Sequence, residues 1–288
     1  MYEWTRERGA PKDQEVARVQ ASLGIEADGL FGPLTEAAVS TYQRDVMGVD
    51  SKVIDQPMME ALGMPIHLGI DVSAYQADTD WKAVASSGVK FMWRKATEGQ
   101  THVNSERGDD QGDGVAFARD AVRAQNQGIL TGFYHFGRPD SGSRDPKKDA
   151  EAEASHFLRW VFSDLADLPP VIDLEKGRKG DPDYNAKWLV HFCDIVEQSF
   201  QRRCVIYTAS WAYDMFLKGA DDLLIEYIKR RPLWLADYDG EPDNEKRIWD
   251  EYSVHQFTGT GSIPGVRGNC DVNWSAGGWI ERLTGCAA

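Results

Sequence analysis

The stretch Val171-Ile172-Asp173-Leu174-Glu175 is an apolar strand candidate that carries two acids at its end. Residues i and i+2 of a strand face the same side, so Asp173 and Glu175 are expected to point together, with Ile172 and Leu174 packed on the other side. Two neighbouring carboxylates resist double ionisation, which raises one pKa and supplies a general acid near neutral pH. The alternative is a strand end that runs into a solvated loop, since Lys176 follows.

Comparable strand candidates recur through the rest of the chain, with helical patterns between many of them. The strand candidates are Leu68–Val72, Val89–Lys95, Ile129–Phe136, Pro170–Leu174, Cys204–Thr208, Leu233–Tyr238, Tyr252–Phe257 and Cys270–Asn273, and the helix candidates are Trp81–Ser87, Val115–Gln127, Lys147–Phe162, Tyr184–Phe200 and Asp221–Arg230. This alternation predicts an α/β fold with a mainly parallel sheet, and eight strands predict a (β/α)8-like barrel. The connections between the last strands are too short for helices, so we expect the barrel to be irregular there.

Residues 13–63 have a different pattern, that of a small helical unit. Val16, Val19 and Leu23 form one helical stripe, Thr35–Met47 is a second helix candidate, and Pro57 stands near the start of a short third helix. Three short helices give a marginal core, which favours a binding module over an enzyme. We therefore predict a three-helix domain at residues 1–64 and a barrel domain at residues 65–288.

The charge balance excludes some classes of partner. The chain carries a formal net charge of −14, which argues against nucleic acid, because phosphate binding needs basic patches. No apolar run is long enough for a membrane span, and the first residues lack the apolar core of a secretory signal, so the sequence predicts a protein that is made in the cytoplasm. The four cysteines (Cys193, Cys204, Cys270 and Cys286) form no CxxC pair, and we expect buried free thiols.

Active sites of β/α barrels gather at the carboxyl ends of the strands. Those ends are rich in acids, and aromatic and polar residues accompany them. The acids are Asp71, Glu98, Asp173, Glu175, Asp237 and Asp271, and the accompanying residues are Tyr134, His135, Tyr207, Trp234, Tyr238 and Gln256. Glycoside hydrolysis requires such a site, in which one carboxylic acid protonates the leaving oxygen and a carboxylate stabilises or attacks the anomeric carbon, or activates water.

Several of these residues also have structural interpretations. Asp71 and Asp271 could be cap or turn acids, Glu98 could organise its loop, and His135 could be a hydrogen-bonded core residue. Other chemistries lack their motifs: there is no HExxH, no dense His/Cys cluster, no GxSxG and no nucleotide-binding loop. The sequence therefore predicts a site without a metal or a cofactor.

Residues 66–288 resemble glycoside hydrolase family 25, the muramidase family of lysozymes. The matching segments are Gly69–Ser73 with Gln76, Lys95–Gly99, Gly132–Phe136, Val171–Glu175, Val205–Thr208, Leu233–Tyr238, His255–Thr258 and Asp271–Asn273, with Gly265 between the last two. The resemblance implies that Glu175 is the proton donor and Asp173 its partner carboxylate. It also implies that Asp71 and Asp271 shape an acidic cleft, and that Tyr134, Tyr207 and Gln256 line the sugar site.

The family cuts the β-1,4 bond between N-acetylmuramic acid and N-acetylglucosamine, so the resemblance implies bacterial peptidoglycan as the substrate. Two alternatives stay open at this point: a wall-binding protein whose barrel no longer cuts, and a glycosidase that acts on a chitin-like polymer. The stereochemical course is also open, because carboxyl groups about 5 Å apart imply retention and wider spacing implies inversion. The 2-acetamido group of the substrate could itself serve as nucleophile, with Asp173 orienting it.

Residues 13–63 resemble the three-helix peptidoglycan-binding module, through Val19-Gln20, Leu23-Gly24, Asp28–Thr35, Ala38-Val39 and Tyr42-Gln43. The second half departs from the module, because the glycine-bearing turn expected before the last helix is replaced by Ser51–Asp55. A binding module in front of a catalytic domain resembles a phage endolysin. That resemblance implies a monomer that stays in the host cytoplasm until another protein opens the way to the cell wall.

Overall fold

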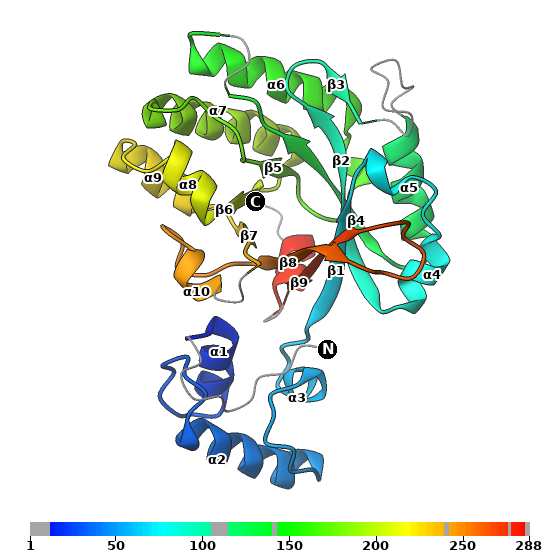
Figure 1. Ribbon diagram of the computed structural model, residues 1–288, viewed down its shortest axis with the longest axis vertical. Coiled ribbons are helices and arrows are strands. Elements are labelled where there is room, and N and C mark those ends of the chain that lie inside the picture. The colour runs from blue at the N-terminus through cyan, green and yellow to red at the C-terminus, as the bar shows by residue number, and fades with distance from the viewer. Residues whose placement is uncertain (1–11, 105–114, 140–142, 239–241, 276–277, 286–288) are drawn as a thin grey trace.

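The computed structural model describes residues 12–104, 115–139, 143–238, 242–275 and 278–285, and its main part is a closed barrel (Figure 1). The strands follow one another around the sheet in the order β1-β9-β8-β7-β6-β5-β4-β2-β3, and β1 also pairs with β2 to close a ring of eight. Their bounds are β1 His67–Val72, β2 Val89–Glu98, β3 His102–Val103, β4 Leu130–Phe136, β5 Val171–Asp173, β6 Val205–Ala209, β7 Leu233–Ala236, β8 Val254–Gly261 and β9 Cys270–Ser275. The predicted fold class is confirmed.

The barrel is irregular where the sequence predicts it to be. Neighbouring strands from β1 through β2 and β4 to β8 are parallel, whereas β9 is antiparallel to both β8 and β1. The five predicted helices are present with ends within two residues of the expected ones: α4 Trp81–Ser86, α5 Val115–Gln125, α6 Pro146–Trp160, α7 Pro182–Phe200 and α9 Asp222–Lys229. Strand β3 and the helices α8 Ser210–Phe216, α10 Pro242–Glu245 and α11 Trp279–Gly285 are additional elements.

Aromatic side chains fill the interior of the barrel. Trp93 and Trp234 lie with their ring centroids 4.7 Å apart, in one apolar cluster with Phe91, Val171, Val205 and Val254. Two glycines provide the room: a Cβ atom on Gly69 would lie 2.2 Å from the Phe91 ring, and one on Gly132 would lie 2.4 Å from the Trp93 indole. Ile280 and Leu283 of α11 join the same cluster. Helix α11 thus closes one end of the barrel, and the tryptophans form the floor of whatever opens at the other end.

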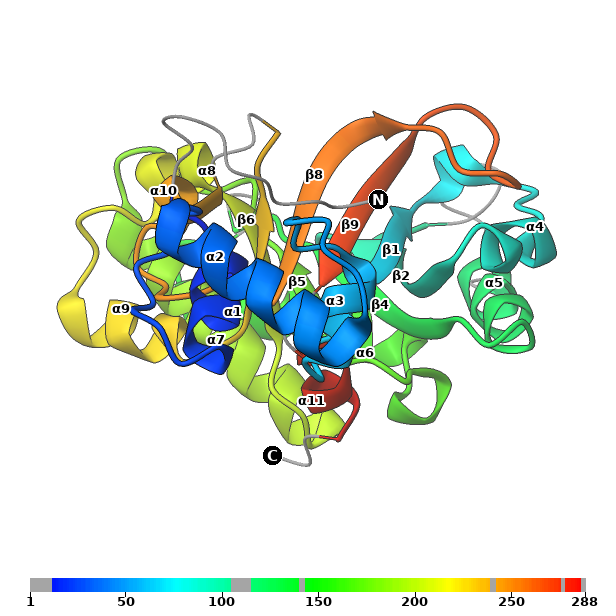
Figure 2. The same cartoon turned by 90° about the horizontal axis from the view of Figure 1, so that it is seen from below.

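Helices α1 Gln14–Ser22, α2 Pro33–Tyr42 and α3 Gln56–Ala61 form the N-terminal unit, and a π-helical turn, Gln43–Met47, extends α2. They lie beside the barrel, next to the beginning of β1 (Figures 1 and 2). Two buried amides hold the loops of the unit. Gln20 binds Asp28, Gly29, Leu30 and Thr35, and Gln43 binds Ser51, Lys52 and Val53.

The turn before α3 explains the departure from the binding module noted in the sequence. Lys52 has a backbone φ of 58°, in the left-handed region, as Gly29 has with a φ of 76° in the loop before α2. The expected glycine turn is therefore present in conformation although a lysine occupies it. A left-handed non-glycine residue costs free energy, so this loop forms at a small expense of stability.

Helix α1 contacts the barrel directly. The Gln14 side-chain amide donates to the Tyr252 carbonyl at 3.0 Å and accepts from the Tyr252 N–H at 3.1 Å, and Arg18 forms an ion pair with Glu251. The boundary between the two predicted domains, at residues 64 and 65, stays a prediction. None of the helices in the described ranges is both long and apolar enough to cross a membrane.

Candidate active site

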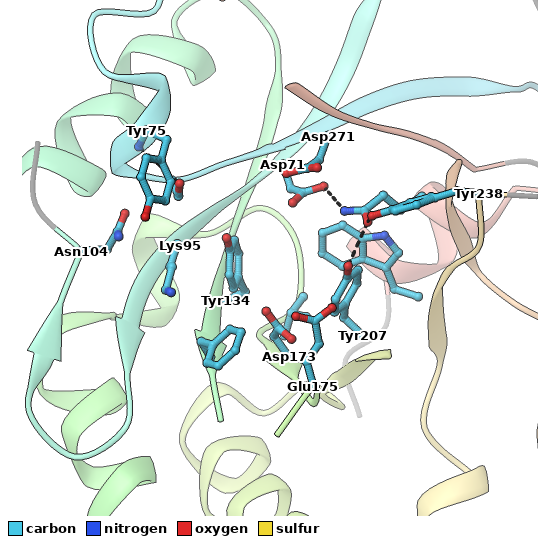
Figure 3. A pocket seen from close by; sticks show the side chains of 15 residues that line it. Asp71, Tyr75, Lys95, Asn104, Tyr134, Asp173, Glu175, Tyr207, Tyr238 and Asp271 are labelled. Carbon is cyan, nitrogen blue, oxygen red and sulfur yellow. Dashed lines mark hydrogen bonds between the residues drawn. The ribbon is translucent and has the colours of Figure 1, made fainter. Parts of the chain in front are cut away.

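A pocket of about 330 Å³ opens at the carboxyl ends of the barrel strands (Figure 3). Nine of the twelve predicted site residues line it: Asp71, Tyr134, Asp173, Glu175, Tyr207, Trp234, Tyr238, Gln256 and Asp271. All four predicted catalytic acids are among them. The strand ends thus bring together side chains that lie up to 200 positions apart in the sequence.

The local prediction for residues 171–175 holds in the structure. Asp173 ends β5, and Glu175 lies two residues further on, with both side chains at the pocket. Ile172 and Leu174 are fully buried on the opposite side, against the surrounding helices. The chain beyond β5 stays extended, because the Leu174 N–H donates to the Tyr207 carbonyl at 2.9 Å. This fixes the direction in which Glu175 leaves the backbone.

The second pair of acids comes from the antiparallel seam. Asp71 on β1 lies directly opposite Asp271 on β9, and directly opposed side chains share one face of a sheet. One Asp71 carboxylate oxygen accepts hydrogen bonds from Gln256 and from Asn273, each at 2.8 Å. Asn273 in turn accepts from the Trp234 indole at 2.7 Å. Asp71 is therefore held in place by neutral amides, with no cation bound to it among these contacts.

Two tyrosines are tied to the same network. The hydroxyl groups of Tyr207 and Tyr238 both donate to the Gln256 side-chain carbonyl, at 2.8 and 2.5 Å (Figure 3). Gln256 therefore has its oxygen turned to the tyrosines and its nitrogen turned to Asp71. The arrangement fixes one wall of the pocket from three different strands and the residues that follow them.

Burial raises the pKa of every acid in the pocket, and repulsion from a neighbouring carboxylate adds to it at Asp71, Asp173 and Asp271. Burial, followed by the charge of Asp271, raises the pKa of Asp71 to about 8. Burial and the charge of Glu175 raise the pKa of Asp271 to about 6. Burial likewise raises the pKa of both Asp173 and Glu175, and the charge of Glu175 adds to the effect at Asp173. The site therefore holds protons at neutral pH, as a general acid requires.

Asp173 differs from the other acids in its contacts. Its side chain is buried, and within the described residues its Oδ1 atom has no hydrogen-bond partner. A buried carboxylate oxygen without a donor is costly for the fold. Such an atom in a pocket points to a donor that arrives with the ligand.

The opposite side of the pocket is lined by different chemistry. Tyr75, Lys95 and Asn104 lie there, beyond Tyr134 in Figure 3, and Phe136 also lines the pocket. Tyr75 is 91% exposed and Tyr238, on the other side, is 60% exposed, so flat aromatic surfaces stand at both sides of the opening. Aromatic rings of this kind offer apolar platforms to sugar rings.

Three predicted substrate-binding residues lie outside the lining of this pocket. His135 is fully buried on the helix side of β4, stacked on Phe192 and hydrogen-bonded to Glu153 at 2.9 Å. Glu98 accepts hydrogen bonds from Lys95 and Arg138. Asp237 follows β7 on its outer side, where its carbonyl accepts from His255 at 2.8 Å. The structural interpretations weighed for Glu98 and His135 fit their positions.

The sequence reasoning missed six lining residues: Ser73, Tyr75, Lys95, Asn104, Phe136 and Val171. For Lys95 a signal existed, because it lies two residues after Trp93 on β2, and Trp93 points into the barrel. Asn104 and Tyr75 come from loops that meet only in three dimensions, where the side-chain Oδ1 atom of Asn104 accepts from the Ala74 N–H at 2.8 Å. No local pattern predicts that contact.

Among the described residues that line the pocket, no group of ligand atoms lies close enough together to be typical of a metal site. Elsewhere among the described residues, Cys193, Glu197 and Cys204 have ligand atoms within 4.8 Å of one another. The Glu197 carboxylate is already bound by the Arg231 guanidinium, at 2.8 and 3.1 Å. Cys193, Cys204 and Cys270 are buried free thiols, as predicted, and Cys286 lies outside the described residues.

An irregular β/α barrel with paired acids, a hydroxyl and amide network and aromatic walls defines a glycoside hydrolase. Comparison with known proteins specifies the family. Residues 70–266 match the glycosyl hydrolases family 25, and the chain belongs to that family. It is thus an enzyme of the lysozyme type, a muramidase by family.

Named relatives agree with this assignment. The chain is 30% identical over 212 residues to lysozyme M1 of Streptomyces globisporus, covering 71% of this chain and 66% of that protein. Among solved structures, the lysozyme of Streptomyces coelicolor is similar with a TM-score of 0.60 and 28% identity, covering 77% of this chain and 96% of that one. The CTP1L endolysin gives a TM-score of 0.61 and 26% identity, covering 76% and 70%.

Proposed function

We propose that this enzyme hydrolyses the β-1,4 bond between N-acetylmuramic acid and N-acetylglucosamine in bacterial peptidoglycan, with Glu175 as the general acid. The observation that carries the proposal is the pair at the end of β5, in which Asp173 and Glu175 share one pocket with raised pKa values. A general acid needs a proton near neutral pH and access to the leaving oxygen. Glu175 meets the second condition better than Asp173, because it is only half-buried.

Asp173 acts as the partner carboxylate. The acetamido N–H of the bound sugar donates to its unpartnered Oδ1 atom, and a hydrogen bond to a carboxylate favours the ionised form. The proton of the pair then resides on Glu175. The acetamido carbonyl, oriented by Asp173, attacks the anomeric carbon as the glycosidic bond to the protonated oxygen breaks. Water then opens the resulting ring with Glu175 as base, and the configuration is retained.

The remaining acids support the charge that develops on the sugar. Asp271 and Asp71 lie on the far side of the pocket from β5 (Figure 3), and Asp271, with a pKa of about 6 against about 8 for Asp71, carries most of their negative charge at neutral pH. Positive charge on the anomeric carbon in the transition state is stabilised by such fixed groups more than the neutral substrate is. Tyr134, Tyr207 and Gln256 line the sugar site, and Trp234 forms its floor.

The biological setting is also part of the proposal. We infer that the N-terminal helical unit binds the cell wall and adds avidity on a polymeric substrate. The resemblance to a binding module in front of a catalytic barrel, together with the similarity to an endolysin structure, favours a phage endolysin. On this account the enzyme is a monomer that stays in the host cytoplasm until it is released to the wall.

The test compares purified peptidoglycan digested by wild type, by Glu175→Gln and by Glu226→Gln, a matched change of an exposed glutamate on α9. Wild type and Glu226→Gln release reducing ends without new free amines. Glu175→Gln loses activity by about 10²- to 10⁴-fold and still binds the wall. Release of free amines instead of reducing ends indicates an amidase or a peptidase and refutes the proposal, and full activity of Glu175→Gln refutes the assignment of the acid.

A further inference from the structure

The pocket has two chemically different halves. Four carboxylates and the tyrosine–glutamine network occupy one half, and Lys95 and Asn104 occupy the other (Figure 3). Lys95 is the only cationic side chain among the described residues that line the pocket. A single ammonium group in an acid-rich pocket marks the place where an acceptor or an anion of the ligand is expected.

Lys95 is held in a fixed position by its neighbours. Its ammonium donates to Glu98 at 2.6 Å and lies 4.6 Å from the centre of the Phe136 ring. Burial opposes ionisation of Glu98, but the hydrogen bonds from Lys95 and Arg138 outweigh it and lower its pKa. An ammonium has three N–H donors, so two remain for a ligand after the bond to Glu98.

Asn104 presents donors at the same place. Its Oδ1 atom accepts from the Ala74 N–H at 2.8 Å and from the Arg94 guanidinium at 2.6 Å. Because both partners are donors, the orientation of the amide is determined, and its nitrogen is the atom left for the pocket. Nδ2 has no partner within the described ranges. Lys95 and Asn104 therefore form a corner that can only donate, and it requires a ligand group rich in oxygen acceptors.

We propose that Lys95 and Asn104 bind the 3-O-lactyl group of N-acetylmuramic acid and thereby select this sugar over N-acetylglucosamine. The lactyl ether is the group by which the two sugars differ, and its terminal oxygens accept hydrogen bonds both as a free carboxylate and as the amide that carries a stem peptide. It projects from the carbon next to the acetamido group. Lys95 is also close enough to the acid pair for its charge to act on both Asp173 and Glu175. One sugar ring can therefore contact Asp173 through its acetamido group and Lys95 through its lactyl group.

This inference rests on the proposed muramidase function, and binding measurements separate the two. In the Glu175→Gln background, titration calorimetry compares a peptide-free oligosaccharide of alternating N-acetylglucosamine and N-acetylmuramic acid with a chitin oligosaccharide of equal length. We expect the parent to prefer the first ligand by about 10- to 100-fold, the range for hydrogen bonds to a charged group. Adding Lys95→Met or Asn104→Asp abolishes the preference, with unchanged affinity for the chitin oligosaccharide, and Lys95→Arg restores part of it.

The variants differ in what they preserve. Asn104→Asp keeps the oxygen that accepts from Ala74 and Arg94 but removes the N–H donors. Lys176→Met is the matched control for charge, because Lys176, like Lys95, lowers the pKa of Glu175 but does not line the pocket; it leaves the preference intact. Unchanged preference in Lys95→Met, or no preference in the parent, overturns the proposal. Wild-type enzyme that prefers the muramic-acid ligand but releases no reducing ends leaves this subsite standing and refutes the proposed reaction.

Discussion

The cleft and the N-terminal helical unit bury polar side chains in opposite ways. In the helical unit, the buried amides of Gln20 and Gln43 each satisfy both their oxygen and their nitrogen within their own loops. In the cleft, Asp173 is equally buried but keeps an oxygen without a donor, and four acids share one pocket. Satisfied groups stabilise a fold, whereas unsatisfied groups are tolerated where a ligand supplies the missing partner.

Among the variants that test this comparison, the largest effect is expected when the Asp173 carboxylate is replaced by an amide. Asp173→Asn should reduce reducing-end release by about 10²- to 10³-fold, the cost of losing one preorganised electrostatic contact, while stabilising the protein at pH 7. The pKa of Asp173 is raised in the folded protein. The contribution of Asp173 to stability is therefore full below its unfolded pKa and is lost as pH rises through its folded pKa. Urea denaturation should therefore show that Asp173→Asn and wild type are equally stable near pH 3, and that Asp173→Asn is more stable by about 1–3 kcal/mol at pH 7. Lower stability at pH 7 contradicts this account.

The next effect concerns the helical unit. Gln20→Ala removes an amide that binds four partners in one loop, and should lower the free energy of unfolding of this unit by about 2–4 kcal/mol. Hydrolysis of a soluble oligosaccharide should stay unchanged, while clearing of intact peptidoglycan falls. Equal losses on both substrates would show that the barrel depends on this unit for its own structure. Thr41→Ala, at an exposed site on α2, serves as the control.

A smaller effect is expected at Glu15, where the N-terminal helical unit contacts the barrel. Burial raises the pKa of Glu15 on α1 to about 7, although the charge of Arg18 opposes this. The contribution of Glu15 to stability is therefore full below its unfolded pKa and is lost as pH rises toward 7. Relative to wild type, Glu15→Gln should gain about 1–3 kcal/mol between pH 5 and pH 8. Thermal unfolding across this range measures it, and parallel curves for the two proteins contradict it.

The smallest effect tests the left-handed turn before α3. Lys52→Gly should stabilise the protein by about 1 kcal/mol or less, because glycine adopts the φ of 58° without a steric cost. The gain is reduced by the loss of a long ion pair with Glu36, at 3.7 Å, and by the greater freedom of glycine in the unfolded chain. Lys52→Ala, which keeps the strain and loses the ion pair, separates these contributions in the same melting experiment.

Side chains alternate between the two faces of a strand, and this alternation determines how much of the site could be predicted. Asp173 and Glu175 were predictable because only one short segment is involved. The same rule could have excluded His135, since Tyr134 beside it faces the pocket and neighbouring residues face opposite sides. It could also have included Lys95, on the face of Trp93. A register shift between Lys95 and Thr97 then reverses the alternation, so the position of Glu98 is not readable from the sequence.

Other features needed the folded chain. The ring of eight strands followed from counting strands and helices, but the β1–β9 pairing that sets Asp71 opposite Asp271 joins residues 200 positions apart. The contact between the Asn104 side chain and the Ala74 N–H joins residues only 30 positions apart, but it too becomes visible only in the folded chain, where it orients the Asn104 amide. The sequence does not predict helix α11, because its apolar residues are few. Its role in closing one end of the barrel follows only from the contacts of Ile280 and Leu283 with the apolar cluster inside the barrel.

The central claim is that the cleft cuts the bond on the muramic acid side of the glycan. Peptidoglycan digested by wild-type enzyme should be reduced with borohydride, hydrolysed in acid and analysed for amino-sugar alcohols. We expect the new reducing ends to be N-acetylmuramic acid, so that muramitol accumulates in step with digestion and glucosaminitol does not. Accumulation of glucosaminitol instead would mean that the enzyme cuts the other linkage, and would contradict both the proposed reaction and the orientation of substrate in the pocket.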